Sequence, residues 1–350
     1  MTVTITSIGS NAFSSMTTLT TVNASAATGM TSIGGNAFRG LTSLASVTLP
    51  TGLQTIGASA FQSDTALSSI AIPSTVTTIG ASAFRSTGAL TSVTFPGASQ
   101  LTSIGYGAFL GAGLTSFAMP NTVATLGASA FYQTTNLTTV TLSAALTSIP
   151  DDAFNQSRAL TGTITIPSSV TTIGKRAFRY SGLTGVTLNA NLRLIDDGAF
   201  SDTPVTGPIV LPSLVHTVGF GAFDATSITS VTLNEGLRTI DNVAFRSSAL
   251  AGAVTLPSTV RTIGDGAFSD TRLTSITLND GLLSIGEQAF NGNPALTARF
   301  TSWLTAIRRT ASAMSSIGAV TCLLPSPGGQ ARTRAPCGRR RGRTRASPPT

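Results

Sequence analysis

The chain has 350 residues, of which 41% are hydrophobic and only 10% charged, and this length indicates either two domains or one extended repeat array. Its net charge of +8 comes from the C-terminal segment, because residues 297–350 carry 10 basic and no acidic side chains. Residues 1–296 carry 11 basic and 13 acidic ones, which excludes a basic repeat region. No run of 18 apolar residues occurs, and the N-terminus lacks the basic and apolar segments of a secretory signal, so neither a membrane span nor such a signal is predicted.

The first residues already resemble part of a strand. Val3, Thr4 and Ile5 alternate in polarity as the middle of a half-buried strand does. We therefore expect either a truncated N-terminus or an exposed first strand that is prone to pair with another chain.

One dipeptide, Ala-Phe, recurs along the chain at spacings of 22 to 25 residues. Five residues before each of these phenylalanines stands Ile, Leu or Val, usually followed by Gly. Self-similarity at such a period indicates a stacked repeat architecture. The phenylalanines are Phe13, Phe38, Phe61, Phe84, Phe109, Phe131, Phe154, Phe178, Phe200, Phe223, Phe245, Phe268 and Phe290.

Each unit begins with an alternating segment and ends with the phenylalanine. In the unit over residues 44–61, Val47, Thr48 and Leu49 predict a strand with alternate side chains buried, and Pro50 is expected to end it. The following Ile-Gly-x-x-Ala-Phe segment is too short for a full helix. It predicts a turn followed by a single helical or 3-10 turn that packs its Phe beneath the strand.

One unit alone cannot enclose a core, because a single strand and a single turn leave both flanks exposed. Stacking supplies the missing contacts. We predict a repeat solenoid over residues 1–300, with about 13 units, a parallel sheet on one face and short helical or 3-10 turns on the other. At a strand spacing of about 4.8 Å, the resulting rod or horseshoe-like arc is about 60 Å long.

A longer period of 45 residues appears in the second half of the chain, where Pro167, Pro212 and Pro257 are evenly spaced. An extra residue precedes the strand in every second unit, at residues 161–163, 206–208 and 251–253. We expect two-unit blocks that were duplicated together, each with a bulge at one edge.

The last fifty residues depart from the repeat. Apolar residues spaced over 302–317 predict a short helix within a C-terminal cap over residues 301–324. Residues 325–350 are rich in Arg, Pro and Gly and predict a disordered basic tail. Two interpretations of this tail stay open, an arm for nucleic acid or another anionic surface, and a mispredicted exon or shifted frame in a GC-rich gene.

The unit Leu-x-x-Val-x-Leu-Pro-x-x-Leu-x-x-Ile-Gly-x-x-Ala-Phe resembles the BspA-type leucine-rich repeats over roughly residues 3–296. The Cys that such units often carry three residues after the Phe is replaced here by Asp64, Thr87, Thr134 or Ser157. The Asn of the commoner leucine-rich pattern is replaced by residues such as Gly52 and Thr75, and neither substituted position belongs to the predicted apolar columns. Thr134 and Ser181, in the loops after Phe131 and Phe178, are expected on the surface opposite the sheet. The resemblance implies a leucine-rich-repeat fold and a surface or adhesin-like role, which suggests an extracellular or cell-surface location.

Groups suited to catalysis are scarce in the repeat region. His216 is its single histidine and is expected at the surface, so no Ser-His-Asp triad or histidine metal site can be assembled. Asp151, Asp197, Asp265 and Glu287 fall three residues before a Phe, in one column with Lys175. Capping of the short turn is the expected role of these carboxylates, and a glycosidase pair or calcium site is the alternative. We predict no catalytic residue, metal site or cofactor.

The residue between the Val and Leu of each strand should point away from the core, and it is mostly threonine. The threonine face comprises Thr48, Thr94, Thr141, Thr165, Thr187, Thr232, Thr255 and Thr277. The preceding outward position is mostly Ser or Thr, so an almost uncharged hydroxyl surface is expected. Threonine is favoured in strands for structural reasons alone, and a binding role is the functional alternative.

We predict a non-enzymatic binding or adhesion protein whose threonine face meets a protein or glycan partner. An intracellular scaffold that contacts nucleic acid or an anionic surface only through its basic tail is the alternative. A carboxylate-based enzyme or metal site at the acidic edge is a third possibility from another class.

Overall fold

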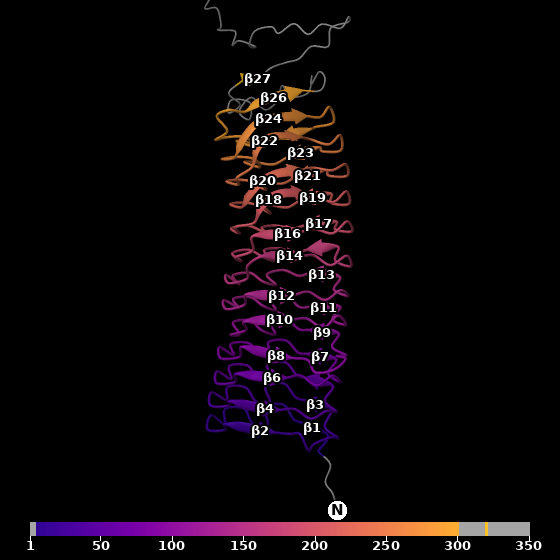
Figure 1. Cartoon of the computed structure of the whole chain (residues 1–350), viewed down its shortest axis with the longest axis vertical. Helices are drawn as coiled ribbons and strands as arrows, with labels where there is room; N and C mark the ends of the chain where they lie inside the picture. Colours follow the sequence, from indigo (N-terminus) through magenta and orange to yellow (C-terminus); the bar gives the residue numbers. More distant parts are fainter. Residues whose placement is uncertain (1–4, 301–318, 321–350) are drawn as a thin grey trace, which may run out of the picture.

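A computed structural model describes residues 5–300 and 319–320. The chain winds into successive coils that each contribute one strand to each of two separate ladders, and the coils stack into an elongated, nearly straight column (Figure 1). Every strand pair is parallel, which confirms the predicted solenoid with a parallel sheet. The predicted cap over residues 301–324, apart from Ala319–Val320, and the tail over 325–350 lie outside the described residues, as do Val3 and Thr4.

The first ladder contains the strands predicted from the alternating Val-x-Leu segments, and it occupies one side of the column in Figure 1. The middle residue of each three-residue strand points inward between two outward side chains. The strands are β2 (Thr21–Asn23), β4 (Ser46–Thr48), β6 (Ser69–Ala71), β8 (Ser92–Thr94), β10 (Ser116–Ala118), β12 (Thr139–Thr141), β14 (Thr163–Thr165), β16 (Gly185–Thr187), β18 (Thr206–Val210), β20 (Ser227–Thr232), β22 (Ala251–Thr255), β24 (Arg272–Leu278) and β26 (Thr297–Phe300), and β27 (Ala319–Val320) pairs with β26.

Pairing in the first ladder alternates along the column. Strands associate as β2–β4, β6–β8, β10–β12, β14–β16 and β18–β20, and the last group begins with β22–β24. The register shifts between Gly207 and Pro208 in β18, and between Gly252 and Ala253 in β22. These shifts confirm two of the three predicted bulges, whereas β14 pairs with β16 over Thr163–Thr165 without a register shift.

The second ladder was not predicted from the sequence. It is built from two-residue strands whose second residue is the aliphatic side chain five residues before the Phe, which is buried in every strand except β1, where Ile8 is half-buried. The strands are β1 (Ser7–Ile8), β3 (Ser32–Ile33), β5 (Thr55–Ile56), β7 (Thr78–Ile79), β9 (Ser103–Ile104), β11 (Thr125–Leu126), β13 (Ser148–Ile149), β15 (Thr172–Ile173), β17 (Leu194–Ile195), β19 (Thr217–Val218), β21 (Thr239–Ile240), β23 (Thr262–Ile263) and β25 (Ser284–Ile285).

The second ladder is interrupted once, between β11 and β13. Elsewhere the residue after the buried aliphatic side chain donates its amide to the preceding coil, as Gly127 does to Ile104 and Gly174 to Ile149, both at 2.8 Å. The corresponding residue after β13 is Pro150, which has no amide hydrogen to donate. The break therefore follows from one residue.

The prediction of helical or 3-10 turns around the phenylalanines is wrong, because the described residues contain no helix. In every coil the residues two before and two after the Phe have positive φ, such as Ser59 (56°) and Ser63 (64°). Left-handed residues at this spacing cannot continue a right-handed helix. They turn alternate amides along the column instead, so Ser59, Phe61 and Ser63 each donate to the next coil at 2.8 Å.

The core is one continuous cluster that runs the length of the column. Its centre is a stack of the thirteen repeat phenylalanines, whose consecutive ring centroids lie between 5.2 and 5.7 Å apart. All of them from Phe38 onward are at most 1% exposed, whereas Phe13 is 37% exposed. Stacking therefore completes the core that no single coil can enclose.

Candidate functional site: the threonine face

The first ladder brings the predicted threonines onto one outward-facing surface. Seven of the eight side chains are exposed, and Thr277 is half-buried. Thr165 is paired with Thr187 and Thr255 with Thr277, so these residues are direct cross-strand neighbours. The threonine face is interrupted, because Ala71, Ala118 and Val210 occupy the equivalent position in other coils.

The hydroxyls of the threonine face make no hydrogen bond within the described part of the protein. Another set of threonines, located just before the strands, is engaged with the backbone. Thr138 Oγ1 donates to the Thr115 carbonyl at 2.9 Å, and Thr115 Oγ1 donates to that of Thr91 at 3.2 Å. The hydroxyls of the threonine face therefore remain available to solvent or a ligand.

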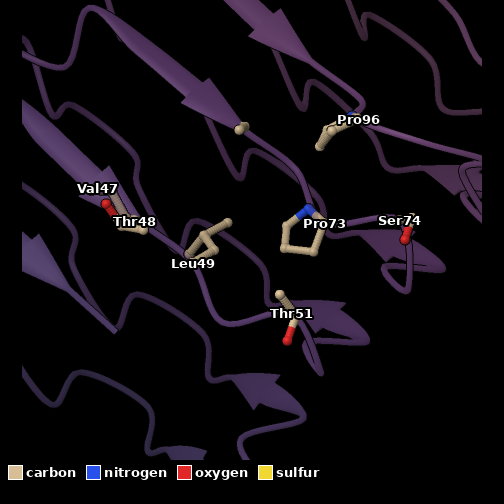
Figure 2. A pocket seen from close by; sticks show the side chains of 8 residues that line it. Val47, Thr48, Leu49, Thr51, Pro73, Ser74 and Pro96 are labelled. Atoms are coloured by element: carbon tan, nitrogen blue, oxygen red, sulfur yellow. The ribbon is translucent and has the colours of Figure 1, made fainter. Parts of the chain in front are cut away.

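A hollow of about 300 Å³ lies beside the threonine face, at the C-terminal ends of strands β4 and β6 (Figure 2). Thr48, Leu49, Ala71, Pro73 and Pro96 contribute to its lining, together with Val47, Thr51 and Ser74. No charged side chain is among these residues. The hollow can receive a small apolar group bordered by hydroxyls, and only Thr48 connects it to the threonine face.

The acidic column is a structural device that links successive coils. Asp151 Oδ1 accepts the Lys175 amide at 2.8 Å, and Asp265 Oδ1 accepts the Glu287 amide at 2.7 Å. Asp197 Oδ1 accepts the Phe220 amide of the next coil at 3.1 Å, while its Oδ2 binds Lys175 Nζ at 2.9 Å. These carboxylates do cap amides, but the amides belong to the neighbouring coil and not to a helical turn of their own.

Ion pairs join neighbouring coils on the same side of the column. Arg176 contacts Asp152 through both carboxylate oxygens, at 2.9 and 2.8 Å. Burial opposes ionisation of Asp152, but hydrogen bonds from Arg176 and Asn155 outweigh it and lower the pKa of this carboxyl. The carboxylates of Asp151, Asp152, Asp197 and Asp265 are thus held by structural partners. The described residues contain no group of three His, Cys, Asp or Glu side chains that could hold a metal ion.

Sequence reasoning missed a buried polar column three residues after the phenylalanines. Thr134 is fully buried and Ser181 is 3% exposed, so the expectation that they lie on the surface is wrong. The column consists of Asp64, Thr87, Thr134, Ser157, Ser181, Thr203, Thr226, Ser248, Thr271 and Asn293. Most of its hydroxyls donate to the carbonyl of the Phe in their own coil, as Thr87 does at 2.7 Å, which satisfies them without water.

His216 lies at the surface, as expected, with its Nδ1 at 3.1 Å from the Gly236 carbonyl. Across residues 5–300 and 319–320, no helix is long and apolar enough to cross a membrane.

Comparison with known proteins gives a consistent family and fold. The family model described as BspA type leucine rich repeat region matches residues 1–111, 102–219 and 195–318. Comparison with curated proteins finds no match.

Solved structures give the same fold. A leucine-rich repeat protein from Bacteroides ovatus is 21% identical with a TM-score of 0.55, and the match covers 84% of this chain and 88% of that one. The pneumococcal vaccine antigen PcpA is 18% identical with a TM-score of 0.51, and the match covers 90% of this chain and 83% of that one. The repeat unit, the two parallel ladders and the family match agree along most of the sequence, and the chain belongs to the BspA type leucine rich repeat family.

Proposed function

We propose that this protein is a non-enzymatic binding or adhesion protein that presents the threonine face to a protein or glycan partner. The observation that carries the proposal is a set of exposed hydroxyls without internal partners, held on in-register strands. A rigid ladder fixes their positions before a ligand arrives, which reduces the entropy lost on binding. Family membership and the likeness to a named vaccine antigen support a location outside the cell or at its surface.

The face is suited to an extended ligand that forms many weak hydrogen bonds. Its outward residues carry almost no charge, and the row of serines and threonines just before the inward residue, such as Ser92 and Thr139, adds further exposed hydroxyls. Isolated hydroxyl contacts contribute about 0.5–1.5 kcal/mol each, so affinity would come from their number along the column.

The proposal is tested by placing charge on the middle of the threonine face. We expect the triple variant Thr141→Lys/Thr165→Lys/Thr187→Lys to lose binding by about tenfold or more on glycan and protein arrays, because bulky cations would block the hydroxyl surface. All three side chains are exposed, so circular dichroism should be unchanged.

The matched control places three lysines outside the strands, at the exposed residues Thr42, Thr65 and Thr135. This variant has the same added charge and should bind within about twofold of the unmodified protein. Binding that survives the change on the threonine face, or that is lost equally in both variants, would refute the proposed site.

A further inference from the structure

A row of basic side chains lies on the second ladder, away from the threonine face. This basic stripe comprises Arg193, His216, Arg238 and Arg261, all exposed, each two residues before a buried aliphatic residue of β17, β19, β21 or β23. Backbone bonds join them directly: the His216 amide donates to the Arg193 carbonyl at 3.3 Å, that of Arg238 to His216 at 2.9 Å, and that of Arg261 to Arg238 at 2.8 Å.

The stripe is confined to four consecutive coils. In the preceding coils the same position is uncharged, with the residues Thr6, Thr31, Gln54, Thr77, Thr102, Ala124, Thr147 and Thr171. In the following coil it is Leu283, which is 78% exposed. The repeat therefore does not require a basic residue here, and the charge is concentrated along one short segment of the column.

The arginines of the stripe have no part in the ion pairs found among the described residues, which involve Lys175, Arg176, Arg179 and Arg246. Arg261 Nη1 donates to two carbonyls, that of Ser258 at 3.0 Å and that of Gly281 at 3.1 Å. Gly281 directly follows Asp280 in the chain.

Nearby carboxylates contact other groups. Asp196 and Asp241 accept the amides of the residues that follow them, at 2.8 and 2.7 Å, and Glu235 accepts Ser258 N and Oγ at 3.0 and 2.9 Å. The side chains of Arg193 and Arg238 themselves make no hydrogen bond or ion pair within the described residues, so their guanidinium groups keep donors available to a ligand.

We propose that the basic stripe binds an acidic polysaccharide that bears carboxylate or sulfate groups at regular intervals. Successive members of the stripe are one strand spacing apart, about 4.8 Å, and one sugar ring of an extended chain has a similar length. The guanidinium fork binds carboxylate or sulfate oxygens through paired hydrogen bonds. Beside the stripe, Thr217, Thr239 and Thr262 offer hydroxyls for sugar hydroxyls.

The ladder residues that flank the stripe favour a polysaccharide over single-stranded nucleic acid, and the nearest exposed ring, Phe220, lies in the turn after β19. Proteins that bind single strands use aromatic side chains on which bases stack. The ladder residues next to the stripe are Leu194, Thr217, Thr239 and Thr262, none of which is aromatic.

The test compares two triple variants of the full chain with the same loss of charge. Arg193→Gln/Arg238→Gln/Arg261→Gln removes the arginines of the stripe, and Arg39→Gln/Arg85→Gln/Arg158→Gln removes three exposed arginines elsewhere. Both are also made in a full-length background in which the seven arginines between 326 and 350 are glutamine, so that binding by this segment is subtracted. Polygalacturonate and dextran sulfate are the probes, with neutral dextran and single-stranded oligothymidylate as comparisons.

We expect the stripe variant to bind one or both acidic polysaccharides about tenfold more weakly, with a reduced dependence on salt, and the control variant to change by less than about twofold. The preferred probe distinguishes carboxylate from sulfate recognition. Equal losses in the two variants, or no loss in either, would overturn the proposal. Tighter, stripe-dependent binding of oligothymidylate would assign the stripe to nucleic acid instead. Because the threonine face is intact in both variants, the result is independent of the proposed function.

Discussion

Asp64 is the one carboxylate of the buried polar column, where other coils carry Thr, Ser or Asn. Its Oδ1 accepts the Leu41 amide from the preceding coil at 2.8 Å, and its Oδ2 has no partner. Burial raises the pKa of Asp64 to about 7, although the backbone hydrogen bonds from Leu41 and Gly40 oppose the shift. The folded protein therefore holds this proton at pH values where the unfolded chain has released it.

Because the folded pKa lies above the unfolded value, the free energy of unfolding should fall as pH rises from about 4 to about 7, by about 4 kcal/mol from this group. Asp64→Asn keeps the acceptor for Leu41 but cannot ionise, so it should match the unmodified protein near pH 4 and exceed its stability at pH 8. Urea unfolding at both pH values measures the difference. The exposed Asp270→Asn serves as the control, and an unchanged pH dependence in Asp64→Asn would contradict the argument.

The buried polar column shows where sequence reasoning failed for single residues. Thr134 and Ser181 follow the phenylalanines in segments predicted to be loops opposite the sheet, so they were expected at the surface. A Thr hydroxyl, however, can satisfy itself by donating to a carbonyl three residues earlier, as Thr203 does to Phe200 at 2.6 Å. Residue type alone does not distinguish this buried arrangement from a solvated one. The alternation of apolar and polar residues did locate the eight residues of the threonine face, because it determines which side chains of a strand point outward.

At the scale of elements, each coil depends on its neighbours through the phenylalanine stack. Phe178 packs between Phe154 and Phe200 at centroid distances of 5.4 and 5.3 Å and is fully buried. Phe13 is more than a third exposed, and its described ring contact is with Phe38 at 5.2 Å.

Removing the ring at the two positions should have different costs. Phe178→Ala should lower the free energy of unfolding by about 3–5 kcal/mol, because it leaves a cavity between two rigid neighbours. Phe13→Ala should cost clearly less, since part of its ring already meets solvent. Urea unfolding measures both values, and equal losses would show that the rings do not act as a stacked column.

The second ladder could not be predicted because its strands are only two residues long. Alternation needs about four residues to be recognised, and here one buried Ile follows one outward Ser or Thr. The turns were mispredicted for a related reason. Residues such as Arg176 (53°) and Val243 (50°) adopt positive φ, although nothing in their chemistry announces a left-handed conformation. The contacts between coils impose that conformation, and they appear only after stacking.

At the scale of the whole molecule, the second half of the chain repeats every two coils. Coils with Pro167, Pro212 and Pro257 alternate with coils that carry an Asn at the same place. Asn189 Nδ2 donates back to the Pro167 and Val170 carbonyls at 2.7 and 2.9 Å, which joins an Asn coil to the Pro coil before it. The first-ladder pairs β14–β16, β18–β20 and β22–β24 have this same period.

Deletion of residues 168–212 therefore removes one whole period and should leave a folded, shorter column. It brings β14 next to β20, and β14 is equivalent to the lost β18, because Gly162 and Gly207 have the same left-handed φ of 77° and 82°. Stability in a stacked array is a sum over coils and their interfaces, so unfolding should stay cooperative, with an m-value reduced by about a sixth.

Deletion of residues 190–212 removes a single coil and places β16 next to β20. Both of these strands lack the left-handed glycine of β14 and β18 and the bulge that accompanies it in β18. We expect that shorter deletion to destabilise the protein more than the longer one. Urea unfolding followed by circular dichroism compares the two, and greater stability of the one-coil deletion would show that the single coil is the structural unit.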